Sequence, residues 1–185
     1  IGRFDYVLTR ALHSYPELFR ERATGKYVGL CRSGWKVDET GFLQSADNET
    51  LPAVELTENN GVFTGRKVDL VTGRVTRETI SIDTKEYDRL LPPDACVLLI
   101  HIPGGGGMTL EKCKESFKEA RDFCKRYFPE RSFSCFGCIS WIFNPVWRES
   151  LPEANITKLQ KATLAFPFTP VPKSGLYFVF AKDDG

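Results

Sequence analysis

A short apolar run, a glycine-rich loop and a periodic helix follow one another in the middle of the chain. Residues 95–102 are apolar and rich in β-branched side chains, which predicts a buried strand. The loop of Gly104, Gly105, Gly106 and Gly107 follows, and a helical pattern begins after Met108. A buried strand that leads through glycines into a helix start leaves several backbone N–H groups unpaired at one place. The segment therefore suits an anion such as a phosphate, and a merely flexible connection is the alternative.

The composition of the chain limits its class and its partners. Of the 185 residues, 42% are hydrophobic and 26% are charged, as in an ordinary globular domain. The net charge of +1 provides no basic excess, so we expect neither nucleic acid nor a membrane as a partner. No run approaches the roughly 20 apolar residues of a membrane-spanning helix. Because the chain begins at Ile1 and its only methionine is Met108, we expect a fragment that lacks an upstream domain.

The six cysteines occupy positions that favour free thiols. Cys96 lies in the predicted strand, while Cys113 and Cys124 lie on the apolar face of the predicted helix. This placement is typical of small hydrophobic residues in a reducing cytosol, and we expect a cytoplasmic protein. Cys135 and Cys138 have C-x-x-C spacing, but no second such pair or histidine pair completes a tetrahedral zinc site. We therefore predict no metal site.

The first half of the chain combines one helical pattern with several strand patterns. Residues 4–20 are expected to form a helix, because their apolar side chains recur at helical spacing. Residues 41–44 are a candidate short strand. Residues 53–83 are predicted to form a β-meander, with a hairpin turn at residues 59–61 and a second turn at residues 72–73.

The second half alternates strands and helices. The helix after the glycines is expected to end at Phe128–Pro129, and its outer positions are almost all charged. Residues 132–141 are then a candidate strand, residues 153–161 a helix, and residues 164–166 and 176–180 two closing strands.

This order predicts a single α/β domain (α+β, with a mixed sheet) in which a central mixed β-sheet has helices on both faces. Its regions are residues 1–50 (a helix and loops), 51–94 (the meander) and 95–185 (strand, glycine loop, helix, strand, helix and strands).

Several familiar motifs are missing. No Gly-Lys-Ser/Thr follows Gly107, so the loop is not a Walker A motif. The acidic residue of a dinucleotide fingerprint would fall inside the predicted helix. A G-x-S-x-G nucleophile elbow does not occur in the sequence.

Other motifs carry a family resemblance. The loop with His101 at its start approximates the Arg/Gln-x-x-Gly-x-Gly/Ala pyrophosphate loop of the GNAT superfamily of acyltransferases. Further matches are His-Ile-Pro at residues 101–103, S-x-x-x-A-R-x-F at residues 116–123, C-x-S-W at residues 138–141 and N-I-x-x-x-Q at residues 155–160. In this order they resemble the C-terminal domain of bacterial GNAT-like acyltransferase proteins over about residues 95–181.

The resemblance implies an N-acyltransferase fold and activity. The acyl donor would be acetyl-CoA or another acyl-CoA, and the acceptor an amine of a small molecule or peptide. The pyrophosphate would be bound by backbone N–H groups of the loop, those of Gly104, Gly105, Gly106, Gly107 and Met108. The pantetheine would be bound by the strand edge at Ile100 and Ile102. The resemblance also implies an upstream domain as a partner.

Three residues are candidates for the chemistry. Histidine is the usual general base near neutral pH, so His101 is the candidate for that role. Ser140 and Asn155 could donate hydrogen bonds to the thioester oxygen or the thiolate. Each also has a structural alternative: His101 could fix the loop in place, Ser140 could make a hydrogen bond at a strand end, and Asn155 could cap a helix. The alternative function is a non-catalytic GNAT-like module that binds a ligand or supports another domain.

Overall fold

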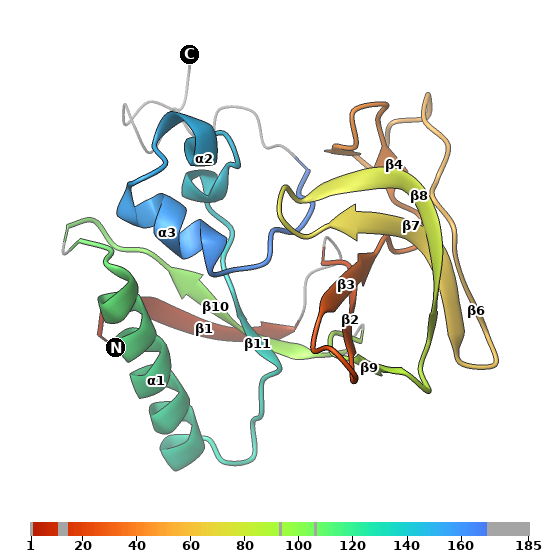
Figure 1. Ribbon diagram of the computed structural model, residues 1–185. Helices are drawn as coiled ribbons and strands as arrows, with labels where there is room; N and C mark the ends of the chain where they lie inside the picture. Colours follow the sequence, from red (N-terminus) through yellow and green to blue (C-terminus); the bar gives the residue numbers. More distant parts are fainter. Residues whose placement is uncertain (1, 11–14, 93, 106, 170–185) are drawn as a thin grey trace. The chain divides into compact units, whose positions relative to one another are not determined.

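The structure is a computed structural model that describes residues 2–10, 15–92, 94–105 and 107–169 (Figure 1). The chain divides into two compact units. The first unit comprises Ile1–Leu12 and Leu91–Leu164, and the second comprises His13–Leu90 and Ala165–Gly185.

The first unit is built on a mixed three-stranded sheet. Its strands are β1 (Asp5–Arg10), β10 (Cys96–His101) and β11 (Cys135–Gly137), in the order β1-β10-β11. Strand β1 is antiparallel to β10, and β11 is parallel to it. The parallel pair is joined through a helix, because parallel neighbours need a long crossover. The α/β class with a mixed sheet is thereby confirmed, as is the strand over residues 95–102.

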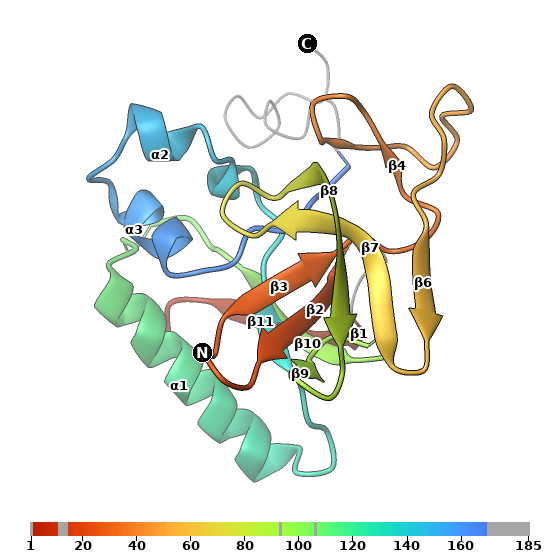
Figure 2. The ribbon, with the colours of Figure 1, turned by 45° about the vertical axis from the view of Figure 1, so that its right-hand side comes forward.

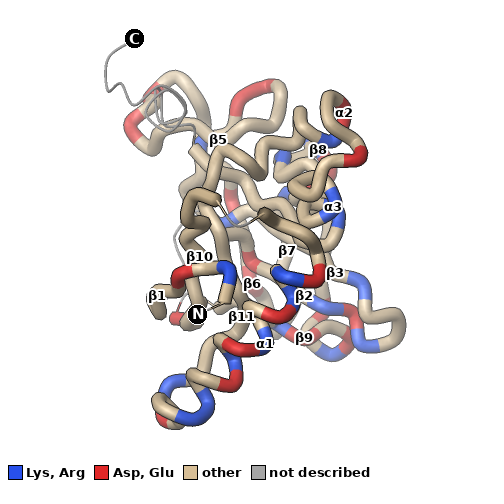
Figure 3. The backbone as a smooth tube through the Cα atoms, turned by 90° about the vertical axis from the view of Figure 1, so that its left-hand side faces the viewer, with Lys and Arg blue, Asp and Glu red and all other residues tan. Residues whose placement is uncertain are grey.

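One long helix and three short ones complete this unit. They are α1 (Leu110–Tyr127), the 3-10 helix η1 (Trp141–Phe143), α2 (Trp147–Ser150) and α3 (Asn155–Lys161). Side chains of α1 and α3 meet the sheet in one apolar cluster that includes Phe4, Cys113 and Leu159. The outer positions of α1 carry charges of both signs along its whole length (Figure 3). The predicted amphipathic helix is therefore confirmed.

The second unit is a β-structure. Its strands are β2 (Glu17–Glu21), β3 (Tyr27–Leu30), β4 (Lys36–Val37), β5 (Leu43–Gln44), β6 (Leu56–Asn59), β7 (Val62–Asp69), β8 (Arg74–Asp83) and β9 (Tyr87–Arg89). One sheet has the order β6-β7-β3-β2-β9, with β8 also paired to β7, and β4 pairs with β5. Figure 2 shows the curved β7–β8 hairpin beside β3.

The predicted meander corresponds to β6, β7 and β8, and its first turn has the expected geometry. Asn60 and Gly61 have φ angles of 49° and 80°. Two consecutive residues of positive φ form the turn that matches the twist of a hairpin, and Asn-Gly tolerates it best. The short strand expected within residues 41–44 is β5, paired with β4.

The described core of the second unit includes a buried charged residue. The side chains of Phe19, Leu30, Phe63 and Ile82, from β2, β3, β7 and β8, form one buried apolar cluster. Glu17 is only 2% exposed, and its carboxylate binds Arg32 at 2.7 Å and Arg89 at 2.8 Å. A buried carboxylate needs such partners, because an unpaired charge in the interior is costly.

The predicted helix over residues 4–20 is wrong. The described parts of this range form β1 and β2, which belong to different sheets. In β1, every second residue faces the same side, and Tyr6 lies opposite Ile100 while Leu8 lies opposite Leu98. The apolar spacing fits a strand as well as a helix, and pairing with β10, far along the chain, decides between them.

Two strands predicted in the second half also differ. The strand expected over residues 132–141 has only the three residues of β11. Residues 164–166 form no strand, although the Ala165 N–H donates to the Leu70 carbonyl at 2.8 Å. The strand expected over residues 176–180 lies outside the described residues.

Candidate functional site

The glycine loop joins the end of β10 to the start of α1. Its residues Gly104, Gly105 and Gly107 are exposed, and Gly106 lies outside the described residues. Gly105 and Gly107 have φ angles of 76° and 69°. These left-handed conformations cost about 1–2 kcal/mol for a residue with a Cβ atom, which explains why glycine stands at both positions. A Cβ atom at Gly104, Gly105 or Gly107 would meet nothing within 4 Å.

Four backbone N–H groups in the described part of this loop have no hydrogen-bond partner. Within the described residues, no hydrogen bond has the amide of Gly104, Gly105, Gly107 or Met108 as its donor. All four precede an 18-residue helix, whose N-terminus carries a partial positive charge. The described part of the loop therefore presents several backbone donors beside open space.

Arg3 ties the two ends of the loop together. Its Nε donates to the Gly107 carbonyl at 2.6 Å, and a terminal nitrogen donates to the Pro103 carbonyl at 2.9 Å. The guanidinium therefore holds two loop carbonyls and brings a positive charge next to the loop. Sequence reasoning missed Arg3, since its partners lie about a hundred residues away and no motif marks it.

Ser116 on α1 holds the backbone that carries Arg3. Its buried Oγ accepts the N–H groups of Arg3 at 3.1 Å and Phe4 at 3.3 Å, and lies 2.7 Å from the Tyr6 hydroxyl. Burial raises the pKa of Tyr6, although the hydrogen bond to Ser116 acts in the opposite direction. Ser116 is the first residue of the S-x-x-x-A-R-x-F motif, so this part of the motif fixes the start of the chain to α1.

The first turn of α1 carries mixed charges. Thr109 caps the helix, and its hydroxyl accepts the Lys112 N–H at 3.4 Å. Glu111 and Lys112 are both exposed in the same turn. The carboxylate opposes an anion at this end of the helix, whereas the lysine and Arg3 favour one.

The predicted pantetheine edge is at the end of β10. Strand β11 pairs with β10 only as far as Leu99, opposite Gly137. Ile100 and His101 continue β10 beyond that point, and Ile100 and Ile102 pack their side chains into the apolar cluster with Met108. In the described part of the chain, no strand pairs with this stretch on the side of β11. Beyond Leu99, this side of β10 therefore has no β-sheet partner among the described strands.

The three candidate chemical residues come from three separate places in the first unit. His101 is the exposed last residue of β10, opposite Asp5 in the register of β1. Ser140 precedes η1, and its Oγ accepts the Ile142 N–H at 3.5 Å, as a cap. Asn155 is the exposed first residue of α3. Within the described residues, no hydrogen bond joins any two of these three.

Gln160, the last residue of the N-I-x-x-x-Q motif, has a structural role. Its buried amide group donates to the carbonyls of Ile142 at 2.8 Å and Asn144 at 3.1 Å. Nearby, the buried Thr157 hydroxyl donates to the Leu151 carbonyl at 2.6 Å and lies 3.1 Å from the Trp147 carbonyl. Gln160 and Thr157 thus fix the segment after the C-x-S-W motif to α3, which is a structural role that sequence reasoning did not assign.

The cysteines are free thiols, as predicted. Burial raises the pKa of Cys135 to about 11 and that of Cys138 to about 12, so both stay protonated at neutral pH. The described residues contain no group of histidine, cysteine and acidic side chains that could hold a metal ion. They also include no helix that is long and apolar enough to cross a membrane.

Comparison with known proteins identifies the family. No curated protein and no solved structure matches the chain significantly. The family described as GNAT-like C-terminal domain matches residues 1–185, which is the whole chain. The chain therefore belongs to the GNAT-like C-terminal domain family.

Proposed function

We propose that this domain binds acyl-CoA and serves as an N-acyltransferase, with the CoA pyrophosphate on the glycine loop. The observation that carries the proposal is the set of four unpaired amide N–H groups, at Gly104, Gly105, Gly107 and Met108. Backbone donors at a helix N-terminus are a general solution for phosphate binding. The family membership favours acyl-CoA over other phosphate compounds, since GNAT folds generally bind it.

The surroundings of the loop fit a pyrophosphate. The space beside the three described glycines is open, so a bulky anion can approach the backbone. The Arg3 guanidinium holds the carbonyls of Pro103 and Gly107, which keeps these acceptors away from an incoming anion. The pantetheine would lie along the backbone of Ile100 and Ile102, next to the loop, where no described strand pairs with β10 on the side of β11.

The proposed reaction moves an acyl group from sulfur to nitrogen. The amine nitrogen attacks the thioester carbonyl carbon, the carbon–sulfur bond breaks, and the thiolate takes up a proton while the amine loses one. His101 would accept the amine proton from its exposed position at the end of β10. Ser140 accepts a hydrogen bond, while its own O–H donates to no group among the described residues, and Asn155 is exposed, so both could stabilise the developing charge.

Calorimetric titration with acetyl-CoA tests the proposal. We expect saturable binding of acetyl-CoA and CoA, and much weaker binding of pantetheine, which lacks the pyrophosphate. Equal affinity for pantetheine and CoA, or no heat with either at millimolar concentration, would contradict the phosphate site.

A matched pair of variants tests whether the pyrophosphate lies on the glycine loop. Gly104 has open space around it and an ordinary backbone conformation, so Gly104→Gln and Gly104→Glu should both fold. The glutamate places a negative charge beside the pyrophosphate, and we expect Gly104→Glu to bind CoA at least roughly tenfold more weakly than Gly104→Gln. Equal affinities would place the phosphates elsewhere.

Turnover separates the enzyme from the non-catalytic module. If acetyl-CoA binds, release of free thiol with a panel of small-molecule and peptide amines should reveal an acceptor, and His101→Gln should lower that rate without weakening CoA binding. Binding without turnover on any amine would favour the ligand-binding module.

A further inference from the structure

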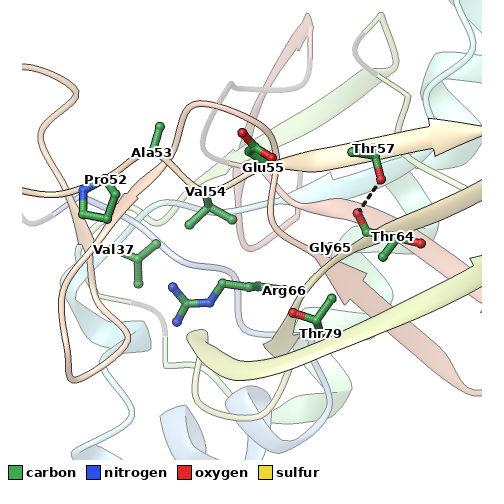
Figure 4. Close-up of a pocket in the computed structure, with 10 residues that line it drawn as sticks. All are labelled: Val37, Pro52, Ala53, Val54, Glu55, Thr57, Thr64, Gly65, Arg66 and Thr79. Atoms are coloured by element: carbon green, nitrogen blue, oxygen red, sulfur yellow. Dashed lines mark hydrogen bonds between the residues drawn. The ribbon is translucent and has the colours of Figure 1, made fainter.

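The second unit contains a groove that the proposed acyl-CoA site does not use. It has a volume of about 400 Å³ and is lined by Val37, by residues 52–55, which lead into β6, and by residues of β6, β7 and β8 (Figure 4). Ligand pockets in proteins typically measure about 300–1,000 Å³, so the groove is large enough for a small molecule.

One side of the groove is the polar face of the sheet. Opposite residues of an antiparallel pair share a face, and Thr57 lies opposite Thr64 while Thr79 lies opposite Arg66. Thr64 and Arg66 are two residues apart on β7, so they also face the same side. All four side chains line the groove, which gives it hydroxyl groups and one cation.

The other side of the groove is apolar. It consists of Val37, Pro52, Ala53 and Val54, and both valines also belong to a buried apolar cluster of the unit. Figure 4 shows the Arg66 side chain running beneath Val54 with its guanidinium next to Val37. A ligand in this groove would therefore meet a charge and an apolar wall at the same place.

Arg66 has spare donors. Its Nε donates to the Thr76 carbonyl at 2.9 Å, which fixes the direction of the side chain. Within the described residues, its terminal nitrogens take part in no hydrogen bond and no ion pair. Glu55 is the one acidic residue that lines the groove, and Figure 4 shows its carboxylate pointing away from the guanidinium.

A half-buried guanidinium with free donors attracts an anion, and its planar shape matches a carboxylate best. The hydroxyl of Thr79, which lies opposite Arg66, can add a further hydrogen bond. We propose that this groove binds a small carboxylic acid with a short aliphatic chain, whose carboxylate lies on Arg66 and whose chain lies against Val37 and Val54. This site is independent of the glycine loop.

NMR titration of the whole chain with hexanoate tests the proposal, with hexanamide, acetate and inorganic phosphate as comparisons. We expect hexanoate at millimolar concentration to shift the amides of Gly65, Arg66 and Thr79. Hexanamide has nearly the same shape without the charge, and acetate has the charge without the chain, so both should bind at least roughly tenfold more weakly.

Arg66→Gln removes the charge, and Arg77→Gln is its control, because Arg77 is an exposed arginine on β8 that does not line the groove. We expect at least a roughly tenfold loss of hexanoate affinity in Arg66→Gln and none in Arg77→Gln. If Arg66→Gln fails to fold, Thr79→Val replaces it and should weaken hexanoate binding several-fold.

Three results would overturn the proposal: no shift of groove amides with hexanoate, equal binding of hexanamide, or equal loss in Arg77→Gln. Binding of acetate or phosphate as tightly as hexanoate would show an adventitious ion only. Because no arm contains CoA, these outcomes are independent of the acyl-CoA test.

Discussion

Replacing Arg3 by methionine should disconnect the two ends of the glycine loop. The change keeps most of the aliphatic stem and removes both hydrogen bonds to the carbonyls of Gly107 and Pro103. Hydrogen bonds from a charged donor contribute roughly 1.5–3 kcal/mol each, and partial exposure of this pair reduces the figure to about 1 kcal/mol each. The loss of about 2 kcal/mol corresponds to a roughly 30-fold weaker bias toward the ordered loop.

CoA affinity should fall in the same proportion if the ordered loop is the binding form. Calorimetry of Arg3→Met against CoA measures the affinity, and ¹⁵N relaxation of Gly104, Gly105 and Gly107 measures the order of the loop. Arg10→Met is the control, since Arg10 is an exposed arginine of the adjoining strand β1 without a side-chain hydrogen bond among the described residues. Unchanged CoA affinity in an Arg3→Met protein with a disordered loop would refute this reasoning.

Three further changes test the rest of the structure. Gln160→Leu leaves the buried carbonyls of Ile142 and Asn144 without donors and should destabilise the protein by about 2–4 kcal/mol in urea denaturation; a loss below about 0.5 kcal/mol would show that water replaces the amide. Glu17→Gln leaves two arginines without their buried carboxylate and should cost about 3–5 kcal/mol by the same assay, so an unchanged midpoint would contradict the buried ion pair. Burial raises the pKa of Cys31 from 9.0 to about 12, so the thiol of the unfolded chain loses its proton at a lower pH than the folded one. The free energy of unfolding should therefore be constant below pH 9.0 and fall above it, by at most about 1.4 kcal/mol per pH unit. Cys31→Ala should show a shallower decline, and a pH profile identical to that of the unchanged protein would contradict this assignment.

Local patterns predict much of this fold. The helix α1, the strand β10 and the Asn60–Gly61 hairpin depend on neighbours in the sequence, and each was predictable from periodicity or turn chemistry. Strand β1 was not, because its apolar residues fit helical spacing and only the distant β10 makes it a strand. Strand β11 is also shorter than its sequence pattern predicts, since it ends at Gly137 although β10 continues to His101.

The candidate site likewise has a part that the sequence predicts and a part that only the structure shows. The glycine loop and its unpaired N–H groups follow from the local order of strand, glycines and helix. Arg3 and Ser116, which hold that loop, are separated from their partners by about a hundred residues of sequence. Gln160 belongs to a recognisable motif, but only the structure shows that it donates to the segment around η1.

The position of CoA on the backbone tests the central claim most directly. In a titration of ¹⁵N-labelled protein with CoA, the amide resonances of Gly104, Gly105, Gly107 and Met108 should move downfield together and saturate at one affinity, because a phosphate accepts their free N–H groups. Saturable CoA binding that leaves these four resonances in place would contradict the assignment of the glycine loop as the pyrophosphate site.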